Sequence, residues 1–322
     1  MLTIDIMHPP FIKPTTSVLS LADYWDHILA RWRINRMGHR VEPALYSLGN
    51  PTPESPVFVT ANYTLSFDAL RSTLKGMDGY ILVLDTQGIN VWCAAGKGTF
   101  GTDELVKRIE ATRLSEVVKH RILILPQLGA PGVAAHEVTK RTHFKVKYGP
   151  VRAEDLSEYL KTREVTPEMR RVRFALKDRL VLVPVEFVAV LLPLLVLIML
   201  GAKGAVAAIL AGTVLFPILL PWLPTHNFST KGFILGGVIA LPFVITAFFK
   251  NPEAALWLRS AWALMYALLI PPITAYIALN FTGATTFTSR TGVKREMFAY
   301  LPAMAWMFGI GLLLNITLIF VY

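Results

Sequence analysis

The sequence predicts an α/β domain with a mainly parallel, Rossmann-like sheet, followed by an all-α membrane domain of five transmembrane helices. In residues 40–162, short apolar runs alternate with amphipathic stretches, a pattern typical of strands and helices that alternate along the chain. Residues 180–322 are instead apolar segments of about 20 residues, the length that spans a bilayer, separated by short polar breaks. A basic connector, residues 163–179, joins the two domains, and residues 1–39 precede them as an N-terminal segment.

The predicted elements of the α/β domain follow from this alternation. Apolar runs predict strands at residues 57–61, 81–84, 122–125 and 144–146. Amphipathic stretches predict helices at residues 67–74, 103–114, 133–141 and 153–160. Ligands of mainly parallel sheets bind beyond the carboxyl ends of the strands. A binding site is therefore expected in the segments that follow these strands, at residues 60–62, 86–97, 126–132 and 148–150.

An amphipathic helix is also predicted in the N-terminal segment, over residues 20–36. Its apolar residues recur at helical spacing and form one face, made of Leu21, Trp25, Ile28, Leu29 and Trp32. We expect this face to cover part of the core; a clasp on the α/β domain and a helix on the membrane surface are the alternatives. Residues 1–16 lack the basic stretch and apolar core of a secretory signal peptide, so none is predicted.

Five apolar segments predict the transmembrane helices, at residues 180–200, 204–223, 232–249, 254–279 and 298–321. The polar segments on one side of these helices, 161–179, 225–231 and 281–297, carry seven, one and three Lys or Arg residues, whereas the other side carries Lys203 and Lys250. Cytoplasmic segments collect Lys and Arg. We therefore predict a multi-pass protein of the cytoplasmic membrane, in contact with membrane lipid, with its α/β domain in the cytoplasm and its C-terminus outside. The net charge of +10 has the same explanation, and no nucleic-acid partner is predicted.

Residues 85–103 connect a predicted strand to a predicted helix and contain Cys93, the only cysteine in the sequence. A glycine-rich connection that holds a thiol at the carboxyl end of a strand is a favourable place for a cofactor. Gly96–Gly101 match the pattern G-x-G-x-x-G, but the first glycine lies too far after the strand for a dinucleotide site. Gly98 follows Lys97 directly, which excludes a P-loop. One cysteine also excludes an intrachain disulfide and an all-cysteine iron–sulfur site.

The sequence Asn-Val-Trp-Cys-Ala-Ala-Gly-Lys at residues 90–97 resembles the cap-helix signature of the membrane corrinoid proteins of microbial mercury methylation, the HgcA family. Further blocks that resemble this family lie at residues 40–46, 60–63, 125–132 and 148–152. That family is similar to the corrinoid iron–sulfur protein of the acetyl-CoA pathway. The chain departs from the latter protein, because one cysteine cannot hold a cluster and the N-terminal residues are too few for its barrel domain.

The resemblance implies a corrinoid cofactor, a cobalt ion in a flat macrocycle, with Cys93 as the lower axial cobalt ligand and the catalytic residue. A thiolate is an electron-rich donor, and the axial ligand is the strongest means by which a protein tunes such a metal. The implied activity is transfer of a methyl group from the corrinoid to inorganic Hg(II), forming methylmercury. The residues implied in cofactor binding are Thr60, Asn62, Asn90, Val91, Trp92, Cys93, Ala94, Ala95, Gly96, Lys97, Gly98, Gly129 and Gly132.

The resemblance also implies protein partners. Hg(II) prefers soft thiolate ligands, and the chain has no thiol besides Cys93. A ferredoxin-like protein with two [4Fe–4S] clusters is implied as reductant and mercury donor, and a methyltetrahydrofolate-dependent methyltransferase as the source of the methyl group. Two alternatives stay open: a membrane corrinoid methyl carrier with a different acceptor, and a non-enzymatic membrane transporter or sensor with an α/β ligand domain.

Overall fold

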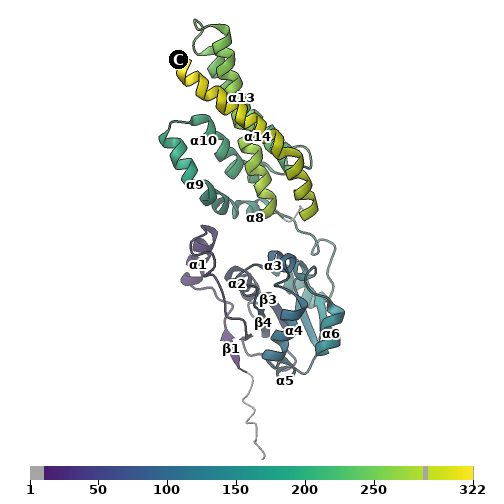
Figure 1. The fold of residues 1–322 in the computed structure, drawn as a ribbon. Helices are drawn as coiled ribbons and strands as arrows, with labels where there is room; N and C mark the ends of the chain where they lie inside the picture. Colours follow the sequence, from purple (N-terminus) through teal and green to yellow (C-terminus); the bar gives the residue numbers. More distant parts are fainter. Residues whose placement is uncertain (1–10, 286–288, 322) are drawn as a thin grey trace, which may run out of the picture. The chain divides into compact units, whose positions relative to one another are not determined.

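The computed structural model describes residues 11–285 and 289–321. The chain divides into two compact units, Met1–Arg173 and Phe174–Tyr322, which we call the α/β unit and the helical unit. The first is built on a six-stranded sheet and the second is made of helices (Figure 1). An α/β domain followed by a helical region is therefore confirmed.

The sheet has the strand order β1-β2-β4-β3-β5-β6. Its strands are β1 (Ile12–Thr15), β2 (Leu45–Leu48), β3 (Val57–Ala61), β4 (Gly79–Leu84), β5 (Ile122–Leu125) and β6 (Lys145–Tyr148). The neighbouring pairs among β3, β4, β5 and β6 are parallel, as predicted. β2 runs antiparallel to β4 and β1 runs parallel to β2, so the sheet is mixed.

Three predicted strands are confirmed and one is displaced. β3, β4 and β5 lie where the apolar runs predict them. The strand predicted at 144–146 begins one residue later, because Phe144 turns into the core ahead of β6 and is fully buried. β1 and β2 were not predicted. Both are four residues long, and β1 contains Pro14, which a strand tolerates at an edge.

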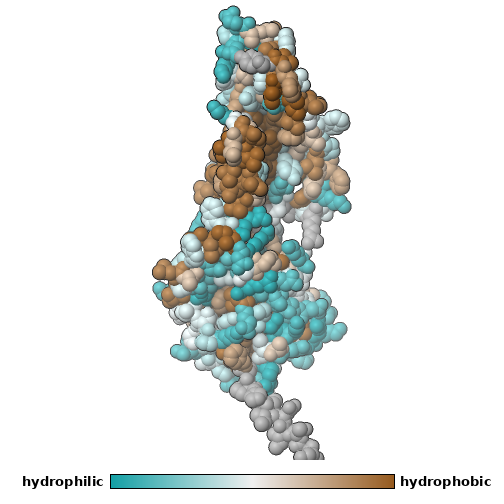
Figure 2. Space-filling view, turned by 60° about the vertical axis from the view of Figure 1, so that its left-hand side comes forward, coloured by the Kyte–Doolittle hydropathy of each residue, from teal (hydrophilic) through white to brown (hydrophobic). Residues whose placement is uncertain are grey.

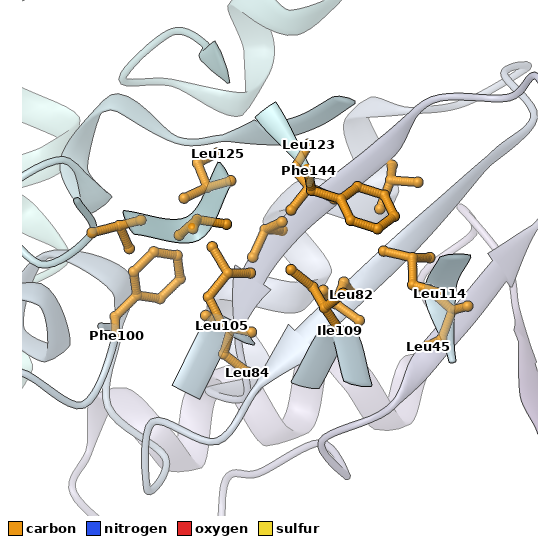
Figure 3. Close-up of a cluster of buried hydrophobic side chains, with 14 of the residues drawn as sticks. Leu45, Leu82, Leu84, Phe100, Leu105, Ile109, Leu114, Leu123, Leu125 and Phe144 are labelled. Carbon is orange, nitrogen blue, oxygen red and sulfur yellow. The ribbon is translucent and has the colours of Figure 1, made fainter. Parts of the chain in front are cut away.

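Helices cover both faces of the sheet. Their bounds are α1 (Leu21–Arg31), α2 (Thr64–Thr73), α3 (Val91–Lys97), α4 (Thr102–Ala111), α5 (Leu114–Val117), α6 (Ala135–Thr142) and α7 (Leu156–Thr162), with short 3-10 turns η1 (Gln127–Gly129) and η2 (Ala153–Asp155). Side chains of α3 to α6 pack on one face of the sheet. Figure 3 shows Leu105 and Ile109 of α4 and Leu114 of α5 in this core. Side chains of α2 and α7 pack on the other. Alternate residues of β4 supply the two cores, Leu82 and Leu84 to the first and Ile81 and Val83 to the second.

The N-terminal helix α1 differs from its prediction in two ways. It ends at Arg31 rather than near residue 36, and its first turn is fixed by a capping box between Ser20 and Asp23. The apolar face expected to cover the core is instead exposed, with Leu21 at 88% and Trp25 at 61% exposure. The helix turns its polar side to the α/β unit, so the prediction of a core-covering face was wrong.

The helical unit contains long apolar helices. They are α8 (Leu176–Leu180), α9 (Val183–Met199), α10 (Lys203–Leu210), a π-helical turn η3 (Ala211–Leu215), α11 (Phe216–Leu219), α12 (Phe228–Phe249), α13 (Leu256–Asn280), a 3-10 turn η4 (Phe281–Ala284) and α14 (Arg290–Val321). In the described part of the chain, four segments are long and apolar enough to cross a membrane: Leu176–Met199, Phe228–Phe249, Leu256–Gly283 and Thr291–Val321. The remaining predicted span forms the shorter apolar helix Lys203–Leu219, so the predicted count of five is not confirmed.

Close packing within the helical unit depends on small residues. A Cβ atom at Gly232 would lie 2.5 Å from the Cα of Ala275, and one at Gly236 would lie 2.6 Å from the Cα of Pro271. These glycines of α12 therefore let its backbone approach α13 closely, the arrangement typical of helix pairs in membranes. The surface of the helical unit is largely hydrophobic, whereas that of the α/β unit is largely hydrophilic (Figure 2).

Candidate cofactor site

Helix α3 follows the carboxyl end of β4 after the loop 85–90, and both of its ends are fixed by local sequence. Asn90 is its N-cap, with extended backbone, and its side-chain oxygen accepts a hydrogen bond from the Cys93 N–H at 2.9 Å. Gly98 ends the helix with φ +86°, a left-handed conformation that favours glycine. The thiol-bearing segment is thus a short helix rather than an open loop.

The loop before α3 is held by Asn62, which lies just after β3. The Asn62 side-chain oxygen accepts hydrogen bonds from the backbone N–H groups of Thr86 and Gly88 at 3.1 and 2.9 Å. Its amide nitrogen donates to Asp85 Oδ1 at 3.2 Å. Asn62 is 2% exposed, so the side chain is a buried brace between two neighbouring strand ends. It fixes the path of the chain into α3.

The two sides of α3 have different surroundings. Ala94 and Ala95 are buried and join the core of the α/β unit. Cys93 is half-buried, and Lys97 is exposed. Cys93 and Lys97 are four residues apart, and Gly96 lies between them at i+3, so all three share the outward side of the helix. The Cys93 thiol and the Lys97 ammonium group therefore lie on the same side of α3, with a glycine between them that carries no side chain.

The glycines near Cys93 fall into two kinds. A Cβ atom at Gly96 or Gly98 would meet no atom within 4 Å. A Cβ atom at Gly132 would lie 2.1 Å from the Phe100 carbonyl oxygen, and one at Gly129 would lie 2.5 Å from the Phe100 ring. Close packing against Phe100 therefore requires glycine at positions 129 and 132. At Gly96 no packing within the chain requires glycine, and the outward side of α3 is open at this position.

Thr99 is a polar residue of this site that the sequence analysis did not single out. Its hydroxyl oxygen is buried and has no hydrogen-bond partner among the described residues. A bound water or a ligand can provide the missing partner of such a hydroxyl. The signal in the sequence was a threonine directly after the glycine that ends α3.

The segment after β5 closes the site on the side of β6. The Thr102 N–H donates to the Gly132 carbonyl oxygen at 3.2 Å, which ties residues 126–132 to the start of α4. The Tyr148 hydroxyl donates to the Val133 carbonyl oxygen at 2.5 Å, and burial raises the pKa of this phenol. The Arg170 guanidinium reaches the Gln127 side chain at 3.1 Å, so part of the basic segment 163–179 packs on this edge of the sheet.

The structure brings most of the predicted site residues to one edge of the sheet. Asn62, the whole of 90–98, Gly129 and Gly132 lie at the carboxyl ends of β3, β4 and β5. Thr60 is buried within β3 and Val91 faces the core, so neither is presented outward. A pocket of about 610 Å³ lies elsewhere, beside α2, with Thr16, Asp23 and Arg71 among its lining residues.

Protein ligands for a metal ion are few. No group of three or more His, Cys, Asp or Glu side chains is placed to hold a metal ion in residues 11–285 and 289–321. Cys93 can therefore act as a single donor to a metal whose other ligands belong to a cofactor. No described atom lies within 4 Å of a Cβ placed at Gly96, so the chain itself does not block the surface beside this donor.

The α/β unit is similar in sequence to known proteins. Residues 33–160 match the family described as CO dehydrogenase/acetyl-CoA synthase delta subunit. The gamma subunit of the acetyl-CoA decarbonylase/synthase complex of Archaeoglobus fulgidus is 37% identical over 114 residues, which are 35% of this chain and 24% of that protein. The family match at residues 33–160 includes Cys93 and the strand ends described above.

Two further relatives extend the comparison. The corresponding gamma subunit of Methanopyrus kandleri is 33% identical over 127 residues, 39% of this chain and 27% of that protein. The corrinoid/iron-sulfur protein large subunit of Moorella thermoacetica is 28% identical over 147 residues, 43% of this chain and 32% of that protein. The chain thus spans about a quarter to a third of the length of these relatives. The predicted relation to the corrinoid protein of the acetyl-CoA pathway is confirmed, and the relation to mercury methylation stays a prediction.

Proposed function

We propose that the α/β unit binds a corrinoid, that Cys93 is the lower axial ligand of its cobalt, and that the chain transfers a methyl group to inorganic Hg(II). One observation carries the proposal. The only thiol of the chain lies on the outward side of a capped helix, next to a glycine over which the structure leaves open space. When bound, a methylcorrinoid would supply the methyl group that is transferred.

The residues around Cys93 have separate tasks in this proposal. The buried side of α3 keeps the helix on the sheet through Ala94 and Ala95, so the position of the thiol is rigid. The Lys97 ammonium is close enough in sequence to stabilise a thiolate at Cys93. The Thr99 hydroxyl can donate to an amide side chain of the corrinoid.

The nature of the donor favours an electrophilic acceptor. A thiolate at Cys93 pushes electron density toward the metal, as an axial thiolate does in other metal sites. Such a ligand favours departure of a methyl group with its bonding electrons, which suits Hg(II). Hg(II) itself prefers thiolates, and Cys93 is the only one this chain offers. A ferredoxin-like partner with two [4Fe–4S] clusters would deliver mercury and electrons, and a methyltetrahydrofolate-dependent methyltransferase would supply the methyl group.

The names of the relatives favour a second candidate function. They are subunits of an acetyl-CoA decarbonylase/synthase complex, or a corrinoid/iron-sulfur protein. The same site would then serve a membrane corrinoid methyl carrier whose acceptor is not mercury. In both cases the helical unit would hold the chain in the cytoplasmic membrane, with the α/β unit in the cytoplasm.

The test uses the purified full chain, loaded with methylcobalamin under anaerobic conditions. Corrinoid absorption that stays with the protein after gel filtration supports cofactor binding, and its absence would favour the transporter or sensor alternative. Hg(II) held by a dithiol is then added, and methylmercury is measured. Formation that requires Cys93 supports mercury methylation. Corrinoid retention without methylmercury, in the presence of the reduced ferredoxin-like partner, would leave only the second candidate function.

A further inference from the structure

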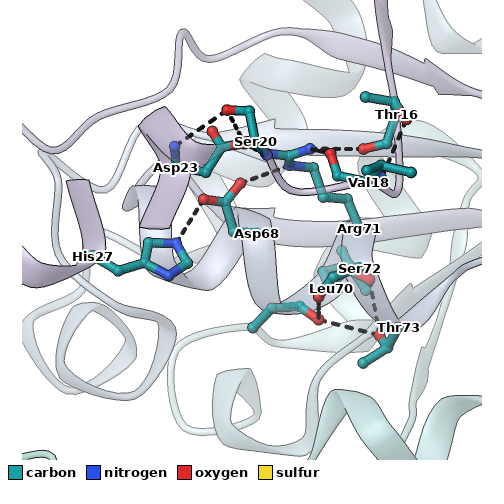
Figure 4. A network of polar contacts seen from close by, with 11 residues as sticks. Thr16, Val18, Ser20, Asp23, His27, Asp68, Leu70, Arg71, Ser72 and Thr73 are labelled. Carbon is teal, nitrogen blue, oxygen red and sulfur yellow. Dashed lines mark hydrogen bonds and ion pairs between the residues drawn. The ribbon is translucent and has the colours of Figure 1, made fainter. Parts of the chain in front are cut away.

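The helix α1 is fixed to the α/β unit by its polar side. Arg71 of α2 lies at the centre of the contact: its Nη2 is 2.9 Å from Asp23 of α1, and its Nε is 2.6 Å from Asp68 (Figure 4). His27 Nε2 lies 2.7 Å from the other oxygen of Asp68. Asp68 and Arg71 are both buried. A buried set of paired charges therefore determines which side of α1 faces inward.

The other side of α1 is apolar and exposed. Leu21, Trp25, Ile28 and Trp32 follow one another at steps of four, three and four residues, so they form one stripe along the helix. All four are exposed, as is Tyr24 at the edge of the stripe. Single exposed apolar side chains are ordinary, but a continuous stripe of large ones marks an interaction surface. The hydrophilic surface of the α/β unit is interrupted by hydrophobic patches on the side of α1 (Figure 2).

We propose that this stripe lies in the surface of a bilayer that contains anionic lipid, as an interfacial helix parallel to the membrane. Tryptophan and tyrosine favour the boundary between headgroups and acyl chains, because their rings are apolar and carry one polar group. Arg33 and Arg36 lie in the turn after the helix, and Arg36 is exposed. Arginines that follow an apolar stripe in the sequence are complementary to lipid phosphates, whereas an apolar surface of another protein offers them no such counter-charge.

The bilayer is available to this helix because the same chain carries four described segments able to cross it. The acidic residues of α1 do not oppose the contact, since Asp23 is paired with Arg71 and Asp26 with His39. Both carboxylates are therefore held in contacts with the α/β unit. The inference concerns a surface apart from the cofactor site, and it holds whatever ligand Cys93 binds.

The test measures the depth of a spin label on the stripe. The full chain carries Cys93→Ala, so that one introduced cysteine is labelled, and is placed in nanodiscs of phosphatidylcholine with phosphatidylglycerol. Leu21→Cys reports on the stripe, and Ile28→Cys repeats the measurement should the first variant fold poorly. Ser115→Cys on α5 is the matched control, because Ser115 is exposed and cysteine has nearly its size. Collisions of each label with oxygen and with a nickel chelate are then compared.

We expect the ratio of oxygen to nickel collisions to be several-fold higher at residues 21 and 28 than at 115, since an interfacial helix is buried about 5–10 Å into the headgroup boundary. The ratio should fall when phosphatidylcholine replaces the anionic lipid. Equal ratios at 21, 28 and 115 would place the stripe in water and overturn the proposal. Labels at 21 and 28 shielded from both reagents would show that a protein covers the stripe, which also overturns it. A ratio that does not depend on lipid charge would overturn the role of the arginines.

Discussion

The side-chain oxygen of Asn90 accepts a hydrogen bond from the backbone N–H of Cys93 at 2.9 Å. This bond closes the first turn of α3 and fixes the backbone from which the thiol projects. Because it involves only residues 90–93, presentation of the thiol is a local property of the sequence. The position of that turn on the sheet depends on residues far along the chain. Asn62 holds the loop before it, and Ala94 and Ala95 pack in the core.

Replacing Gly96 by alanine should weaken cofactor binding without weakening the fold of α3. Nothing lies within 4 Å of the added methyl group, and alanine favours a helix over glycine by up to about 1 kcal/mol. We expect unchanged or slightly slower amide exchange in α3 without cofactor, and weaker retention of methylcobalamin, because the methyl group occupies the space for the macrocycle. Hydrogen exchange by mass spectrometry and corrinoid titration of the full chain measure the two effects.

The matched variant is Gly132→Ala, in which the added methyl group would lie 2.1 Å from the Phe100 carbonyl oxygen. Here the backbone must move, at a cost of about 1–3 kcal/mol for overpacking. Faster exchange around residues 126–132 is therefore expected before any cofactor is added. Equal corrinoid retention by Gly96→Ala and the unmodified chain would show that no flat group lies on this side of α3.

Asn62→Ala should loosen the loop that leads into α3. The substitution removes the acceptor of two backbone N–H groups, and each buried donor left unpaired costs about 1–3 kcal/mol. Amides of residues 85–90 should exchange faster in the variant, while those of α6 stay unchanged. Asn50→Ala is the control, since Asn50 is exposed, and it should leave both regions as they are.

The contact between α1 and the segment before β2, which His39 makes with Asp26, should weaken as pH rises. Burial alone lowers the pKa of His39, but its hydrogen bonds with Asp26 and the Ile34 carbonyl oxygen outweigh burial and raise the pKa above its usual value of 6.5. The pKa of His39 is thus higher in the folded than in the unfolded chain. The contacts of protonated His39 therefore stabilise the fold fully below pH 6.5, and this stabilisation is lost as the pH rises through the pKa of the folded state.

Exchange of α1 amides, corrected for the intrinsic effect of pH, should therefore quicken above neutral pH. His39→Gln should remove this dependence, because glutamine keeps the shape but does not titrate. A profile that is the same in the variant would assign the pH effect to another group.

The C-terminus should lie on the side of the membrane opposite to the start of α8. Arg179 Nη1 donates to the Pro217 carbonyl oxygen at 2.9 Å, so the helix 203–219 returns to the level at which α8 begins. The Ser229 N–H donates to Glu296 at 2.5 Å, which places the starts of α12 and α14 at one level. If Lys203–Leu219, the shorter apolar helix, also crosses the membrane, the chain makes five passes and its two ends lie on opposite sides.

A reporter fused after residue 322 should therefore be active only outside the cytoplasm, in agreement with the distribution of Lys and Arg. A fusion at the N-terminus should report the cytoplasm. The same side for both fusions would show that Lys203–Leu219 does not complete a crossing.

The parts of the fold that were predicted are those with a strong local signal. β3, β4 and β5 are continuous apolar runs, and each was placed correctly. β1 and β2 have no such run, and their pairing depends on residues far along the chain, as between Leu45 and Leu82. Short edge strands of this kind are determined by the sheet that they join.

The orientation of α1 could not be predicted for a related reason. Helical periodicity reveals that a helix has an apolar face, but not which face turns inward. Here the answer depends on Asp68 and Arg71, which lie 41 and more residues away from their partners in α1 and the segment before it. In the cofactor site, the resemblance identified Cys93, whereas the packing roles of Gly129 and Gly132 and the buried hydroxyl of Thr99 required the structure.

The central claim is that Cys93 binds the cobalt of a corrinoid. X-ray absorption at the cobalt edge tests it most directly, on the full chain loaded with a cobalamin and on Cys93→Ala treated in the same way. We expect a sulfur neighbour of cobalt in the unmodified chain, its loss in Cys93→Ala, and a nitrogen in its place in Cys93→His. Cobalt surrounded by nitrogen and oxygen alone in the unmodified chain, with the same spectrum in Cys93→Ala, would contradict it.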